Sequence, residues 1–132
     1  APPVPHRATL PLEDEPRGAR RARRFLRGLL ESWDVDGDVL DTAELCLSEL
    51  VTNAIVHAGT DSLLTVSLER GVLHVEVRDR GAPADVDLVE DDDPLRVFGR
   101  GLQLVDALAD QWGAEHDDGG TRSWFDLEVA AA

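Results

Sequence analysis

Apolar and polar residues recur with two different periods along this chain, and these periods predict where helices and strands lie. In residues 16–32, apolar side chains recur every three or four positions, which is typical of an amphipathic helix beginning at Pro16. A second helical pattern covers roughly residues 39–57, and Gly59 is well placed to end it. The intervening sequence WDVDGD, residues 33–38, predicts a turn.

Short segments rich in β-branched and apolar residues predict five strands. They cover residues 7–12, 62–70, 72–79, 111–118 and 121–129. Gly71 joins the second and third strands into a hairpin, and Gly119 with Gly120 joins the last two. The order of elements predicts an α+β sandwich, with a mixed, largely antiparallel sheet and helices packed on one face.

A long irregular segment separates the two hairpins. Residues 80–98 combine Gly81, two prolines and an acidic run, and long loops inside compact domains are often functional. The sequence GRGLQLVDALAD, residues 99–110, opens with two glycines and then becomes helical. We therefore expect a functional loop that leads into a third helix.

The composition fits one domain and narrows the range of partners. The chain has 132 residues, of which 42% are hydrophobic, and we expect a tail over residues 1–7 and one domain over residues 8–130. A formal net charge of −14 disfavours nucleic acid and anionic membranes as partners. No apolar run approaches the roughly 20 residues of a membrane span, and no signal-peptide pattern opens the sequence. The single Cys46, interpreted as a small core side chain, fits a reducing compartment, so we expect a cytoplasmic protein.

Basic and acidic residues are unevenly distributed. The first predicted helix carries Arg17, Arg20, Arg21, Arg23, Arg24 and Arg27. The acidic run within residues 85–93 lies in the long loop. Charge runs are usually solvated surfaces, and the alternative is that the arginine face meets an acidic partner while the acidic loop moves.

Three polar residues interrupt the apolar second helix. Glu49, Asn53 and His57 are spaced four residues apart, so they lie on one stripe of the helix. An amide oxygen is a suitable hard ligand for Mg²⁺, and a nearby carboxylate can orient or deprotonate an attacking hydroxyl. The alternative is a Glu and an Asn that hydrogen-bond the backbone at the edge of a helix.

Three further segments carry candidate chemistry. Asp79 ends a strand and can accept a hydrogen bond from an exocyclic amino group, while Gly81 lets a flat ring approach the backbone. In FGRGLQLV, residues 98–105, a helix start and Arg100 suit a phosphate group. Thr121, in GGTRSWF, can hydrogen-bond a base or a bridging water. Each segment alone is also compatible with an ordinary turn or strand.

The order of these segments resembles one family over nearly the whole chain. The sequence ELVTNAIVH is followed by DRG, a long loop, GRGL and finally GGT. This layout is similar to that of the GHKL ATPase superfamily, and closest to bacterial anti-sigma regulatory factors that are serine/threonine protein kinases. The resemblance implies the Bergerat fold, ATP and Mg²⁺ as cofactors, and partners that include a sigma factor and a protein antagonist. A homodimer is also implied.

The resemblance also assigns roles to individual residues. Asn53 resembles the Mg²⁺-binding asparagine, and Glu49 resembles the general base or water-positioning acid. His57 resembles a position that often faces the phosphates, and the alternative is an ordinary histidine at the edge of the core. Asp79 resembles the adenine-reading aspartate, with Gly81 beneath the base and Thr121 completing the adenine site. Residues 82–98 would form the ATP lid. The phosphate-binding second glycine box would comprise Gly99, Arg100, Gly101 and Leu102.

Three functions follow from these observations. The first is a Mg²⁺-dependent serine/threonine kinase in which Glu49 activates a hydroxyl of a small protein antagonist. The second is a binding module in which the nucleotide sets partner affinity without significant kinase activity. The third is a structural domain that binds no nucleotide. The retained Glu49 favours the kinase, whereas the acidic run in the lid is unusual for a loop that closes over a triphosphate.

Overall fold

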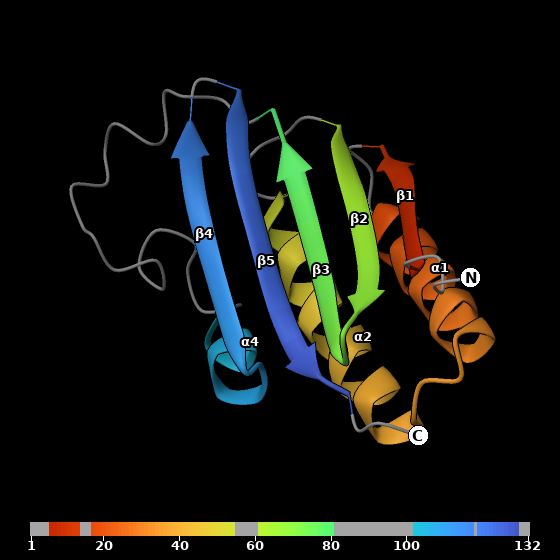
Figure 1. Cartoon of the computed structure of the whole chain (residues 1–132). Coiled ribbons are helices and arrows are strands. Elements are labelled where there is room, and N and C mark those ends of the chain that lie inside the picture. The colour runs from red at the N-terminus through yellow and green to blue at the C-terminus, as the bar shows by residue number, and fades with distance from the viewer. Residues whose placement is uncertain (1–5, 14–16, 55–60, 81–101, 118, 130–132) are drawn as a thin grey trace.

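The computed structural model describes residues 6–13, 17–54, 61–80, 102–117 and 119–129. Within these ranges the chain forms five strands and three helices (Figure 1). In chain order they are β1 (His6–Leu12), α1 (Arg17–Ser32), α2 (Gly37–Asn53), β2 (Ser62–Glu69), β3 (Val72–Asp79), α4 (Leu102–Leu108), β4 (Gln111–Asp117) and β5 (Gly120–Glu128). No described helix is both long and apolar enough to cross a membrane.

The five strands form one sheet in the order β1-β2-β3-β5-β4, and all four ladders between them are antiparallel. Figure 1 shows the three helices together behind one face of this sheet. The two predicted hairpins, β2–β3 and β4–β5, are present, and they meet along the ladder between β3 and β5. The predicted α+β arrangement, with a largely antiparallel sheet and helices on one face, is therefore confirmed.

The core lies between the sheet and the helices. Alternate residues of β3, namely Leu73, Val75 and Val77, are fully buried and face the helices. Helix α1 packs on α2, and α2 packs on α4, β3 and β5. The buried stripe of α1 comprises Gly18, Ala22, Leu26 and Leu30, as its amphipathic pattern predicts. Helix α2 therefore lies at the centre of the helical layer, next to the middle strands.

Helix α2 departs from its prediction at its start and along one side. It begins at Gly37, and the first backbone hydrogen bond runs from the Leu40 N–H to the Asp36 carbonyl oxygen at 2.9 Å. This first turn is polar, so a pattern of apolar residues does not detect it. The apolar pattern of this helix predicts that Leu45 is buried with its other leucines, but Leu45 lies on the outer side of α2 and is 52% exposed. The predicted continuation over residues 55–57 falls outside the described residues.

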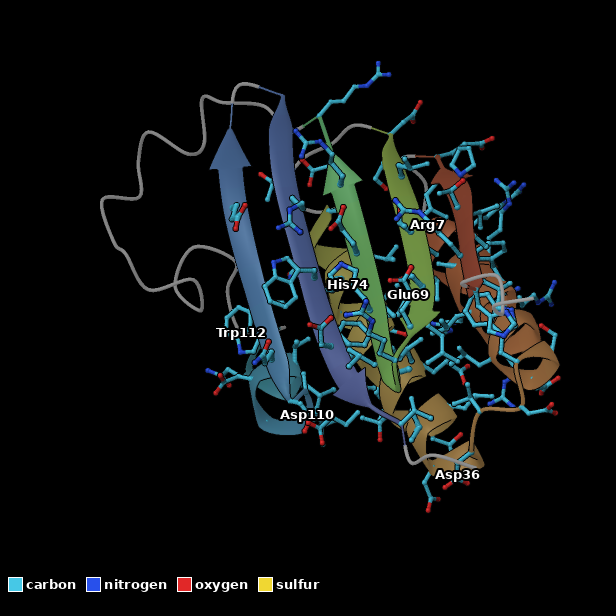
Figure 2. All side chains as sticks on the ribbon, viewed as in Figure 1. Arg7, Asp36, Glu69, His74, Asp110 and Trp112 are labelled. Atoms are coloured by element: carbon cyan, nitrogen blue, oxygen red, sulfur yellow. The ribbon has the colours of Figure 1, made fainter. Side chains whose placement is uncertain are left out.

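The opposite face of the sheet is polar. Figure 2 shows His74 on this face, with the helices behind the sheet. The His74 ring nitrogens contact the carboxylates of Asp126 and Glu76, and Arg122 donates to Glu76 at 2.6 Å. The Trp124 ring covers Gly113 so closely that a Cβ built there would lie 2.8 Å from the indole nitrogen. This face is a network of paired charges, and the apolar core lies entirely on the helix side.

Candidate functional site

Buried polar side chains gather at one end of the helix-facing side of the sheet. Among the described residues, the buried polar side chains are Asn53, Thr65, Asp79, Thr121 and Ser123. Thr65 alternates onto the opposite face, because its register partner is Glu76. Asp79 ends β3, Thr121 and Ser123 are near the start of β5, and Asn53 ends α2. Figure 1 shows that these ends of α2, β3 and β5 lie at the same end of the molecule.

The ladder between β3 and β5 brings Asp79 and Thr121 together. They are register partners, and the Thr121 N–H donates to the Asp79 Oδ1 at 3.2 Å. Only 5% of Asp79 and 6% of Thr121 is exposed. A buried carboxylate is costly unless hydrogen bonds compensate it, so this position favours a site that uses the charge. The sequence motifs placed these two residues in one site, and the structure brings them together.

Gly120 allows this close approach, and the sequence interpretation missed that role. Its backbone φ is +127°, a conformation that residues with side chains rarely adopt. A Cβ built at Gly120 would lie 1.9 Å from the Asp79 carbonyl oxygen and 2.7 Å from the Arg80 Cα. Any side chain would therefore push β5 away from the end of β3. The second glycine of GGT carried this signal, but it was interpreted only as part of a hairpin turn.

Side chains along one stripe of α2, at positions 45, 49 and 53, become progressively more buried toward the C-terminal end of the helix. Leu45 is 52% exposed, Glu49 is half-buried, and Asn53 is only 9% exposed. The Asn53 Nδ2 is buried and has no hydrogen-bond partner within the described part of the chain. Leaving a buried donor unpaired costs about 1–3 kcal/mol. This orphaned amide is the structural feature that a bound ligand would satisfy.

Cys46 is one turn before Glu49 on the buried side of α2. Burial, together with the smaller effect of the negative charge of Glu49, raises the pKa of the Cys46 thiol to about 11. A thiol with so high a pKa stays protonated at neutral pH and is a poor nucleophile. Cys46 is therefore a core side chain, as the sequence predicted.

The glycine-rich segment is only partly described. Leu102 begins α4 and is fully buried in the core, so its side chain anchors the start of that helix. The remaining candidate residues His57, Gly81, Gly99, Arg100 and Gly101 lie outside the described residues, as does the predicted lid, 82–98.

A cavity of about 500 Å³ adjoins the end of β3. Its lining comprises Pro11, Asp61, Ser62, Leu63, Arg78, Asp79, Arg80 and Gly119. Because Asp79 points to the helix side, Arg78 and its register partner Leu63 point to the opposite face. The cavity lining includes neither Asn53 nor Glu49. The candidate site is therefore defined by the buried polar residues on the helix side.

Sequence comparison identifies the class of protein to which this α+β fold belongs. The chain belongs to the family of histidine kinase-like ATPase domains, whose family model matches residues 12–126.

Curated relatives are the serine-protein kinases RsbW of Listeria monocytogenes serovar 1/2a and Listeria innocua serovar 6a. They are 27% and 26% identical to this chain, and each match covers 84% of this chain and 80% of the relative. A solved structure of the RsbU and RsbW domains of Rv1364c from Mycobacterium tuberculosis matches 96% of this chain with a TM-score of 0.74. That match has 20% identity and covers 33% of the longer chain, so it shows the fold.

Proposed function

We propose that this chain binds Mg·ATP between the C-terminal end of α2 and the β3–β5 ladder. The observation that carries the proposal is the buried cluster in which Asp79 accepts from Thr121 while the Asn53 amide nitrogen has no described partner. A purine needs a hydrogen-bond acceptor at its amino edge, and a buried carboxylate provides one. Membership in the histidine kinase-like ATPase family supports the same ligand.

Magnesium fits this donor set when phosphates supply most of its ligands. Within the described ranges, no three His, Cys, Asp or Glu side chains are grouped to hold a metal ion. Mg²⁺ is usually bound by one or two protein oxygens together with phosphates and waters, so Asn53 would hold it through its amide oxygen. When bound, the ion would neutralise charge on the phosphates. The candidate Gly99–Gly101 turn, with Arg100 and Leu102, would contact the same phosphates.

Glu49 is the proposed catalytic base. It lies one turn from Asn53 and is half-buried, so it can face both the site and solvent. In the proposed reaction, Glu49 takes the proton of a serine or threonine hydroxyl on a small protein antagonist. The hydroxyl oxygen then bonds to the γ-phosphorus as the bond to the ADP oxygen breaks. The RsbW relatives are named serine-protein kinases, which supports this reaction type.

The outer surface of α1 is the proposed partner face. Arg17, Arg20, Arg21 and Arg24 are exposed there and make no ion pair within the described residues. Arg27 differs, because it donates to Glu44 at 2.7 Å and is already paired. Leu45, 52% exposed, lines a groove between α1 and α2. Exposed arginines on α1 suit an acidic protein surface such as that of a sigma factor or its antagonist.

Incubation with labelled ATP, Mg²⁺ and candidate antagonist proteins tests the proposal. We expect label on a serine or threonine of one antagonist, and we expect Glu49→Gln to abolish transfer while ATP still binds. Asp38→Asn is the matched control on the same helix, and it should transfer label normally because Asp38 lies in the first turn of α2, at the end opposite Asn53. If the wild type transfers no label and Glu49→Gln still binds its partner in a nucleotide-dependent way, the alternative function, a nucleotide-dependent binding module, is favoured.

A further inference from the structure

The polar part of the site extends further along β5 than along β3. The helix-facing residues of β5 run Thr121, Ser123 and then the apolar Phe125. On β3 the polar stretch is Asp79 alone, because Val77, the register partner of Ser123, is already apolar. Ser123 is 6% exposed, so its hydroxyl is buried one step below the pair of Asp79 and Thr121. Burying a hydroxyl at this depth costs free energy unless the hydroxyl is hydrogen-bonded.

Within the described residues, the Ser123 hydroxyl makes one long hydrogen bond. It donates to the Val77 carbonyl oxygen at 3.5 Å, which is the long limit of a hydrogen bond. A hydroxyl oxygen also has two lone pairs, and no donor contacts them within the described residues. The register neighbour of Ser123 on β4 is Ala114, another small residue. A ligand atom or a water above the sheet would therefore meet two small side chains at this point.

We propose that Ser123 is a specificity-determining residue on the floor of the nucleotide site. Its oxygen accepts a hydrogen, directly or through one water, from the exocyclic amino group of the purine that Asp79 reads. The Val77 carbonyl holds the hydroxyl proton, so the Ser123 oxygen faces the ligand as an acceptor. Two acceptors at one edge favour a base with an amino group over one with a keto group. This inference rests on the proposed ATP site and adds a second residue that reads the base.

The contact between Ser123 and the base is tested by removing the hydroxyl from the protein and the amino group from the nucleotide. Binding of Mg·ATP and of Mg·purine riboside triphosphate, which lacks the amino group, is measured by calorimetry for the wild type and Ser123→Ala. We expect Ser123→Ala to lower the preference for ATP by about fivefold, the loss of one hydrogen bond, with affinity for the analogue unchanged. Thr65→Val is the matched control, because it removes a buried hydroxyl from the opposite face and should keep the wild-type preference.

The outcomes separate this inference from the proposed function. A Ser123→Ala protein with the wild-type preference for ATP overturns the inference and leaves the ATP site standing. An equal loss of affinity for both nucleotides also overturns it, because a purely structural role predicts that result. A wild-type protein that binds no Mg·ATP overturns both. Thermal denaturation checks folding, and Ser123→Cys, which conserves size, replaces the alanine variant if that variant does not fold.

Discussion

Replacing Asn53 with leucine separates the stability of the empty protein from its affinity for a ligand. The Asn53 Nδ2 is buried without a described partner, and such a group costs about 1–3 kcal/mol. Leucine has nearly the same size and no donor, so it removes this cost, while its different shape introduces strain of about 1 kcal/mol. We therefore expect the free energy of unfolding without ligand to stay equal or to rise by about 1 kcal/mol. That rise would increase Tm by about 3–6 °C for a chain of this length.

The same variant should lose its response to nucleotide. Mg·ATP at about 100 times its dissociation constant should stabilise the wild type by about 2.7 kcal/mol. Asn53→Leu has no amide oxygen for the metal, so its thermal transition should not move when Mg·ATP is added. The assay is thermal denaturation with and without Mg·ATP. Thr52→Leu is the control, because Thr52 is the exposed neighbour of Asn53 on α2 and should respond like the wild type.

Two results would refute this reasoning. If Asn53→Leu unfolds more than about 1 kcal/mol more easily than the wild type without ligand, the Asn53 amide has a structural partner after all. If the variant keeps the full stabilisation by Mg·ATP, Asn53 does not hold the metal.

Gly120→Ala should lower the free energy of unfolding by about 2–3 kcal/mol, because its Cβ meets the Asp79 carbonyl oxygen and its φ is strained. Urea denaturation measures this, and Gly28→Ala, an exposed α1 glycine with nothing within 4 Å, should instead stabilise by about 0.5–1 kcal/mol. Burial raises the pKa of Cys46 to about 11 from 9.0, so its contribution to stability is complete below pH 9 and is lost as pH rises through 11. The chain has no Lys or Tyr, so we expect an alkaline loss of up to about 3 kcal/mol in the wild type and a flat profile in Cys46→Ala. Equal profiles in the two proteins would contradict this.

Local patterns predicted most of the elements, and tertiary contacts determined the rest. The amphipathic pattern of α1 and the hairpin at Gly71 depend on neighbouring residues, so the sequence was sufficient for both. The ladder between β3 and β5 joins distant segments, and no local period predicts it. The exposure of Leu45 likewise depends on which side of α2 receives α1 and the sheet, which an apolar pattern alone does not reveal.

The sequence predicts the charged and amide residues of the candidate site, but it does not indicate a role for the small residues Gly120 and Ser123. Asp79 and Asn53 carry recognisable chemistry, and the order of their motifs along the chain, which resembles that of a known family, indicates a binding role. Gly120 matters because of a single backbone contact, and Ser123 because of its depth beneath Asp79. Both properties arise only when two strands are placed side by side. A glycine or a serine in a strand is too common for its sequence context to indicate such a role.

The ladder that brings Asp79 to Thr121 also sets when the site can exist during folding. Each hairpin can form from neighbouring residues, whereas this hydrogen bond joins positions 42 residues apart. Contacts between distant segments form late, because the entropy of closing the loop is lost before the contact is gained. Nucleotide affinity would therefore appear only in chains whose two hairpins have already joined. A labelled nucleotide added during refolding would report the joining of the two hairpins and would ignore chains in which the hairpins are still apart.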